Sequence, residues 1–139
     1  MNDLPMRLNP PSLPPSIGAS QIAEARGRLA FISGQVSVTA DDALVGADDF
    51  VAQLEQAFRN LDIAVREAGA SFHDVVKLSY FCLDRVDRAL LQHVARVRDA
   101  YVDTTRPPAS TFVFVAGLAR RAWLIEVEAV VALPEARPR

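Results

Sequence analysis

Several features that would point directly to a function are missing from this sequence. Cys82 is the only cysteine, so no disulfide bond can form within the chain. No apolar run approaches the ~20 residues that a membrane-spanning helix needs, and the first fifteen residues have no apolar core of the kind found in secretory signals. We therefore expect a cytoplasmic protein without a membrane partner.

Familiar catalytic motifs are absent as well. The sequence contains no phosphate-binding glycine loop, no paired cysteines with zinc-ligand spacing, no serine nucleophile motif and no His-Glu-x-x-His pattern. We therefore expect that the protein needs neither a metal nor a cofactor. His73 and His93 are isolated in the sequence, and we interpret both as structural or solvated residues. Cys82 alternates with Leu78 and Tyr80, which indicates a buried side chain rather than a reactive thiol.

An excess of positive charge is also lacking. The 15 Lys and Arg residues are balanced by 17 Asp and Glu residues, which gives a net charge of −2. Nucleic-acid-binding proteins usually have a basic stripe, so we expect no nucleic-acid partner. A small molecule or another protein chain is the expected partner.

The composition that is present fits one folded domain. The 139 residues match the usual size of a single domain, and half of them are hydrophobic. Five of the nine prolines fall within the first fifteen residues, and proline fixes φ and lacks a backbone donor. We expect an extended Pro-rich segment over residues 1–15, a single domain over 16–134 and a tail over 135–139.

Hydrophobic spacing predicts two helices and five strands. Apolar residues three or four apart predict helices over residues 48–68, capped by Asp48, Asp49 and Gly69, and over residues 86–102, ended by the prolines at 107 and 108. Runs of β-branched and aromatic residues predict strands over 20–25, 28–36, 75–83, 111–116 and 123–133. The first two strands are expected to pair across Arg26-Gly27, and the last two to form a hairpin through residues 117–122.

This order of elements predicts an α+β fold in which two helices cover one face of a mixed sheet and leave the other face open. In the last strand, period-two alternation places Leu124, Glu126, Glu128 and Val130 on the side opposite Ile125. Two carboxylates on a half-apolar face indicate a subunit interface with a polar pocket. We therefore expect self-association.

Four segments in fixed order carry a family resemblance. They are Ser33-Gly34-Gln35, AGASFHDVVK at 68–77, PPAST at 107–111 and IEVEA at 125–129, supported by Ile17-Gly18 and by the spacing of Gln53, Gln56 and Asn60. Over residues 16–133 the chain resembles the Rid/YjgF family, also described as endoribonuclease L-PSP-like. The resemblance implies a chorismate-mutase-like fold, a homotrimer with a central barrel, small-molecule clefts between subunits and, for one branch, deamination of enamines or imines made from amino acids.

The resemblance also implies roles for individual residues. Glu126 falls on the family's catalytic acidic residue, which positions or activates water, and Gly34 falls on a glycine whose backbone contacts the ligand. The family's binding tyrosine falls on Ser20, and its asparagine falls within residues 92–95. The remaining expected substrate contacts are Ser33, Ser110, Thr111 and Phe112.

Ser110 stands where the deaminase branch has an arginine that clamps the substrate carboxylate. A hydroxyl cannot form the two parallel hydrogen bonds of a guanidinium, so we expect little hydrolysis of 2-iminobutanoate or 2-aminoacrylate. Arg106, Arg120 and Arg121 lie nearby in the sequence and could substitute, although we interpret all three as surface charges.

Three functions therefore remain open. The first is a hydrolase or deaminase that acts on an imine, an enamine or a related metabolite. The second is a non-catalytic trimeric protein that binds a metabolite in the same cleft. Serine at residue 110 does not argue against this second function. The third is a ribonuclease, and the acidic charge balance argues against it.

Overall fold

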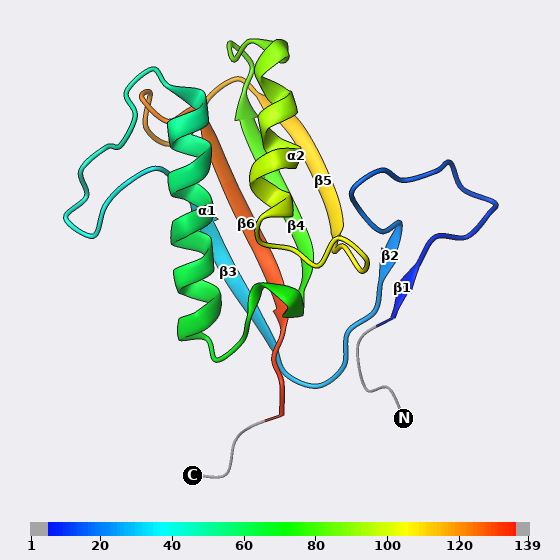
Figure 1. Ribbon diagram of the computed structural model, residues 1–139. Helices are drawn as coiled ribbons and strands as arrows, with labels where there is room; N and C mark the ends of the chain where they lie inside the picture. Colours follow the sequence, from blue (N-terminus) through cyan, green and yellow to red (C-terminus); the bar gives the residue numbers. More distant parts are fainter. Residues whose placement is uncertain (1–5, 136–139) are drawn as a thin grey trace.

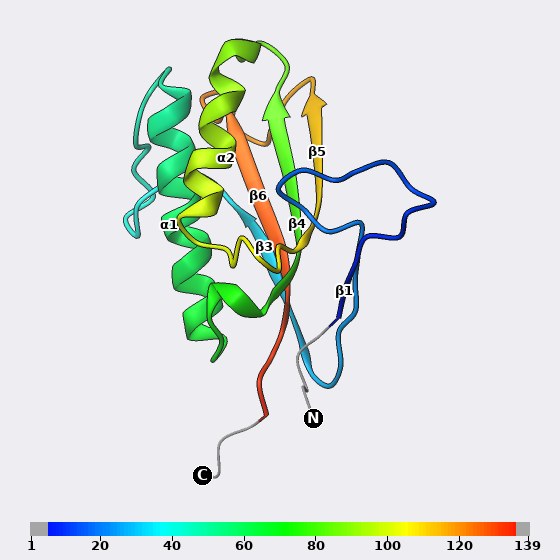
Figure 2. The same ribbon diagram turned by 45° about the vertical axis from the view of Figure 1, so that its right-hand side comes forward.

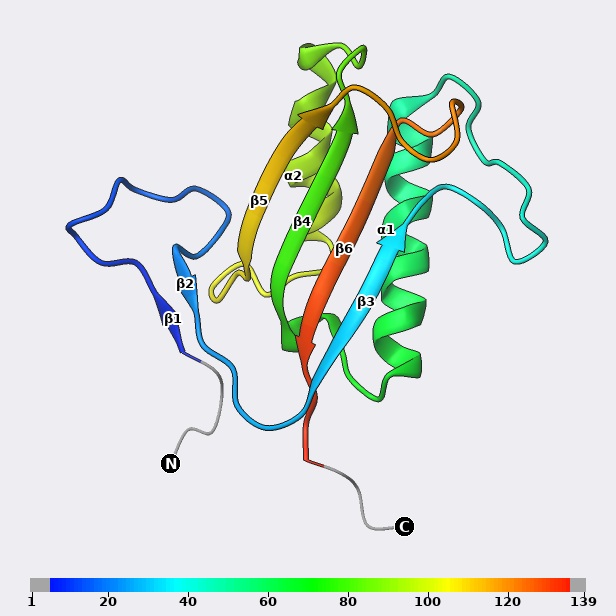
Figure 3. The ribbon, with the colours of Figure 1, turned by 180° about the vertical axis from the view of Figure 1, so that it is seen from behind.

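The computed structural model describes residues 6–135 and contains a four-stranded mixed sheet with two helices on one face (Figure 1). The sheet has the strand order β3-β6-β4-β5, and within residues 6–135 no helix covers its opposite face (Figure 3). The main elements are β3 (Leu29–Gln35), α1 (Phe50–Glu67), β4 (Val75–Leu83), α2 (Gln92–Asp99), β5 (Ala109–Val115) and β6 (Ile125–Ala132). The predicted α+β fold is confirmed, and none of the described helices is long and apolar enough to cross a membrane.

Helix α1 forms where the apolar spacing predicts it. Leu54, Phe58 and Leu61 are completely buried on its inner face. The Asp49 carboxylate accepts the Ala52 amide at 3.0 Å and caps the first turn. Gly69, at φ +92°, follows the last turn in the left-handed conformation that glycine adopts without strain.

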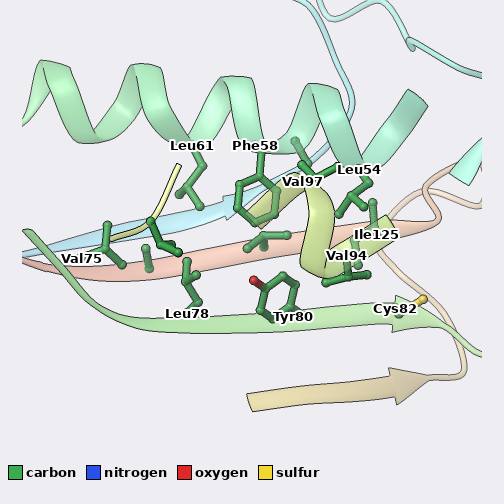
Figure 4. Close-up of a cluster of buried hydrophobic side chains, with 14 of the residues drawn as sticks. Leu54, Phe58, Leu61, Val75, Leu78, Tyr80, Cys82, Val94, Val97 and Ile125 are labelled. Carbon is green, nitrogen blue, oxygen red and sulfur yellow. The ribbon is translucent and has the colours of Figure 1, made fainter. Parts of the chain in front are cut away.

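The hydrophobic core lies between the two helices and the sheet (Figure 4). Phe58 is its centre, with ring centroids 5.9 Å from Phe72, 6.1 Å from Tyr80 and 5.4 Å from Tyr101. Cys82 is fully buried at one end of this layer, as the alternation along the strand predicts. Fully burying an aromatic side chain contributes roughly 1.5–3 kcal/mol, so this cluster is a major source of stability.

The second helical region is shorter and less regular than predicted. A 3₁₀ turn, η2 (Arg88–Leu91), precedes α2, and a second 3₁₀ turn, η1 (Phe72–Asp74), precedes β4. The Asp87 carboxylate accepts a hydrogen bond from the Ala89 amide at 2.9 Å, and the backbone carbonyl of Asp87 accepts one from the Leu90 amide at 3.0 Å. These two hydrogen bonds fix the tight first turn. The single helix predicted over residues 86–102 is therefore wrong in extent but correct in position.

The expected hairpin between the last two strands is wrong. Strand β5 runs parallel to β4, with Leu78 opposite Ser110 and Tyr80 opposite Phe112. Strand β6 instead lies between β3 and β4, antiparallel to both. Its inner residues are completely buried, so the strand gains more by entering the centre of the sheet than by pairing along the edge beside β5.

The expected pairing of residues 20–25 with β3 is also wrong. Strand β2 (Ile22–Ala23) pairs with β1 (Arg7–Leu8) in a separate two-stranded sheet. Ser20 forms a parallel bridge with Ala109, so this segment extends the β5 edge of the main sheet, and residues between β1 and β2 form a projecting loop (Figure 2). Residues 1–5 of the expected Pro-rich segment, and 136–139 of the expected tail, lie outside the described residues.

The open face of the sheet exposes large apolar side chains. Phe31 is 76% exposed, Leu29 42% and Val113 39%. Leu124 does not belong to this group, contrary to expectation. It precedes β6, is 4% exposed and belongs to the core, where its amide donates to Gln53 Oε1 at 2.8 Å.

Candidate functional site

Glu126 and Gly34 form the best-defined polar site on the open face. The register of β3 against β6 shifts between Ile32 and Gln35, which leaves Ser33 and Gly34 in an irregularity of the strand. The Glu126 carboxylate lies directly over Gly34, and a β-carbon at residue 34 would overlap Oε1 of that carboxylate. The absence of a side chain at residue 34 leaves the space that the Glu126 carboxylate occupies.

The surroundings of Glu126 favour its protonated form. Burial raises the pKa of the Glu126 carboxyl, and the neighbouring Glu128 carboxylate raises it further. Among residues 6–135, neither carboxylate has an ion-pair partner. A carboxyl whose pKa is raised in this way holds a proton more readily near neutral pH, which suits a group that accepts and returns one.

Ser110 lies on the other face of the sheet, beneath the helices. It is opposite the buried Leu78, and two residues further along β5 the Phe112 ring stacks on Tyr80 with centroids 5.4 Å apart. Ser20 adjoins this group, because its amide donates to Pro108 O at 3.1 Å and its hydroxyl donates to Pro107 O at 2.6 Å. Ser20, Ser110 and Phe112 therefore form one group.

Thr111 lies on the open face, unlike its neighbour Ser110. Its Oγ1 accepts a hydrogen bond from Lys77 Nζ at 2.6 Å. Ser79 lies beside it on β4 and beside Glu128 on β6, so one strand separates Thr111 from the carboxylates. Lys77 is a polar neighbour of the expected site that the sequence analysis did not single out.

The predicted site residues thus fall into two groups on opposite faces of the sheet. Ser33, Gly34, Thr111 and Glu126 belong to the open face, whereas Ser20, Ser110 and Phe112 belong to the helix-covered face. Within one chain the sheet lies between Ser110 and Glu126. The two residues therefore do not face a common surface of one chain.

The three arginines considered as substitutes for the missing guanidinium have different surroundings. Arg120 forms a bidentate pair with Asp42, with Nη1–Oδ1 at 3.0 Å and Nη2–Oδ2 at 2.9 Å, and lies 5.0 Å from the Trp123 ring centroid. Its donors are therefore already engaged. Arg121 accepts a hydrogen bond from Arg85 through its carbonyl, and the Arg106 amide donates to Asp103 O at 3.1 Å.

Gln53 organises the loops beside the start of β6. It is completely buried, its amide donates to Gly46 O at 3.0 Å and to Ala122 O at 2.9 Å, and its Oε1 accepts the Leu124 amide. The spacing of Gln53 with Gln56 and Asn60 was visible in the sequence, but not this function. Gln53 fixes the strand that carries Glu126.

The remaining candidates have no visible part in the site. His73 is exposed, and His93 Nδ1 lies 3.5 Å from Arg96. Among the described residues there is no group of three or more His, Cys, Asp or Glu side chains that could hold a metal ion. The fold and site define a small α+β protein with an open sheet face, a carboxylate packed over a glycine and a second polar group beneath its helices.

Comparisons with known proteins agree with this description. Residues 13–133 match the family described as Endoribonuclease L-PSP. The chain is 30% identical over 122 residues to a RutC family protein of Synechocystis sp., covering 87% of this chain and 91% of that protein. It is 34% identical over 122 residues to one from Leuconostoc mesenteroides, covering 84% and 91%.

Solved structures give the same result. A Rid family protein from Yersinia pestis superposes with a TM-score of 0.83 at 34% identity, with 93% of this chain and 98% of that chain covered. RidA from the Antarctic bacterium Psychrobacter sp. gives a TM-score of 0.66 at 26% identity, with 92% and 99% covered. The chain belongs to the Endoribonuclease L-PSP family, in which the Rid and RutC proteins are also found. The predicted family and fold are thereby confirmed.

Proposed function

We propose that this protein is a Rid-type hydrolase that deaminates a small imine or enamine at a site between subunits of a homotrimer. The observation that carries the proposal is the position of Glu126 over Gly34, with a raised carboxyl pKa. The separation of Ser110 from Glu126 by the sheet supports a site that two subunits complete. The exposed apolar face supplies a surface on which a second copy would pack.

The proposed reaction needs a group that moves a proton to and from water. Water adds to the carbon of the C=N bond, the resulting carbinolamine loses ammonia, and a ketone remains. Glu126 accepts a proton from the attacking water and passes it to the nitrogen, which gives the carbinolamine. It then takes the hydroxyl proton of the carbinolamine and passes it to the same nitrogen, which leaves as ammonia. The missing side chain at Gly34 leaves room for the carboxylate beside the strand.

A second candidate is a non-catalytic protein that binds a metabolite in the same place. The observation that favours it is Ser110, because one neutral hydroxyl cannot replace a bidentate guanidinium. Hydrogen bonds to charged groups contribute about 1.5–3 kcal/mol each, so the loss lowers carboxylate affinity by one to several orders of magnitude if nothing else replaces it.

The experiment is an assay of ammonia and keto-acid formation from freshly generated 2-iminobutanoate, compared with the spontaneous rate. We expect weak acceleration by the wild type and faster turnover by Ser110→Arg. Adding Glu126→Gln to Ser110→Arg should lower that turnover by roughly 10²- to 10⁴-fold, the usual contribution of a general base. Glu67→Gln, at the exposed end of α1, is the control.

The outcomes separate the two candidates. Equal rates for Ser110→Arg and for Ser110→Arg combined with Glu126→Gln would contradict the hydrolase. Ligand binding without any acceleration in either background would favour the metabolite-binding protein. Strong acceleration by the wild type would show that another cation already holds the substrate.

A further inference from the structure

Arg98 is held in a fixed position at the end of α2. Only 15% of its side chain is exposed, and its Nε donates to Asp99 Oδ1 at 2.8 Å. Gly18, at φ +73°, lies so close to the guanidinium that a β-carbon there would overlap it. The charge is therefore mostly removed from solvent and packed against the N-terminal loop.

Two neighbours link this guanidinium to the part of the fold that carries Ser110. On one side, Gly18 is two residues from Ser20, which bridges Ala109, the residue before Ser110. Figures 1 and 2 show the N-terminal loop beside β5. On the other side, burial raises the pKa of the Tyr80 phenol and the nearby Arg98 acts in the opposite direction.

The Tyr80 ring extends this argument. It stacks on Phe112, two residues beyond Ser110 on the same face of β5. Its hydroxyl is buried and has no hydrogen-bond partner among the described residues. Arg98 and Tyr80 therefore lie on the helix-covered side with Ser110 and Phe112, where sequence analysis placed part of the ligand site.

The two Nη atoms of Arg98, which lie beside Gly18, have the geometry that recognises a carboxylate. Asp99 occupies Nε, which leaves Nη1 and Nη2 as a fork. Over residues 6–135, no acceptor for either Nη atom is found. Two parallel hydrogen bonds from such a fork are stronger and more directional than those from a lysine, and low exposure reduces competition from water.

We propose that Arg98 binds the carboxylate of the ligand, in place of the arginine that the family resemblance expects at residue 110. The inference rests on the proposed function, because the carboxylate is that of a 2-imino acid or its 2-keto acid product. The cation comes from α2 instead of β5, so the acid is held at a different place relative to Glu126.

The test compares the binding of 2-oxobutanoate with that of 2-oxobutanamide, which has the same shape without the charge, by isothermal titration calorimetry. The wild type should prefer the acid by roughly 10- to 100-fold. Arg98→Gln should remove the preference and keep the amide affinity. Arg98→Lys should keep part of it, because a point charge lacks the fork.

Arg96→Gln is the matched control, because Arg96 lies on the same helix, is 55% exposed and pairs with Glu55 at 3.3 Å. It should leave both affinities unchanged. An undiminished preference in Arg98→Gln would overturn the assignment and leave the proposed function standing. Failure of the wild type to bind either compound would overturn both. If Arg98→Gln does not fold, Arg98→Lys decides the question. An unchanged preference of Arg98→Lys for the acid over the amide overturns the assignment, and a partial loss of that preference supports it.

Discussion

Replacing Phe31 with serine tests whether the open sheet face is a subunit interface. Phe31 is 76% exposed in the single chain. Full burial of a phenylalanine contributes roughly 1.5–3 kcal/mol, so covering this side chain would contribute about 1–2 kcal/mol per subunit. A trimer covers three copies, which gives about 3–6 kcal/mol, or roughly two to four orders of magnitude in the trimerisation constant.

Sedimentation velocity over a wide dilution series measures this shift. The wild type should remain a trimer at dilutions where Phe31→Ser has dissociated. Ile63→Ser is the control, because Ile63 on the outer face of α1 is 58% exposed but lies away from the open sheet face. A wild type that sediments as a single chain of 15.2 kDa at every concentration, or a Phe31→Ser variant that assembles equally well, would refute the reasoning.

Three further predictions concern the interior and the site. Tyr80→Phe should raise the free energy of unfolding by about 1 kcal/mol, because it removes a buried hydroxyl that lacks a hydrogen-bond partner among the described residues. A lower free energy of unfolding in urea denaturation would show that the hydroxyl has a partner in solution. Gln53→Leu should lower the free energy of unfolding by ~1–3 kcal/mol, since the buried Leu124 amide loses its hydrogen-bond acceptor. An unchanged midpoint of urea denaturation would contradict this prediction. Burial raises the pKa of the Cys82 thiol to about 11. Iodoacetamide should therefore leave this thiol unmodified in the native protein at mildly alkaline pH and modify it in denaturant. Rapid labelling of the native protein would contradict this and show that β4 opens to solvent.

The helices and most strands could be predicted because their signals are local. The buried face of α1 follows from spacing of three and four, and Gly69 ends the helix where a left-handed residue is needed. The alternation along β6 also correctly assigned Ile125 to the core and Glu126 to the other face.

The arrangement of the strands could not be predicted in the same way. The choice of β6 rather than β5 as the neighbour of β3 depends on pairings between residues about one hundred positions apart, such as Leu29 with Ala132. Short loops favour a hairpin, and this preference was wrong for the loop after β5. The pairing of β2 with β1 was missed for the same reason, because it involves residues 7 and 23 on either side of a long loop.

The resemblance supplied candidate site residues but not the face of the sheet on which each one lies. The resemblance pointed to Ser110 and Glu126, yet only the sheet register shows that they lie on opposite faces of one chain. Arg98 was missed because a charged residue on a mixed helix resembles ordinary surface charge. Its low exposure arises from the packing of Gly18, a contact between segments far apart in the sequence. The roles of these residues remain predictions.

The central position of β6 has a consequence for the order of folding. During synthesis from the N-terminus, β3, α1, β4, α2 and β5 all leave the ribosome before residues 125–132, which join β3 to the rest of the sheet. Until then β3 has no strand partner in the main sheet, and the apolar faces of both helices remain partly uncovered. Nascent chains stalled before residue 125 should therefore be sensitive to proteases and prone to aggregation, whereas chains extended beyond residue 132 should acquire protection in one cooperative step.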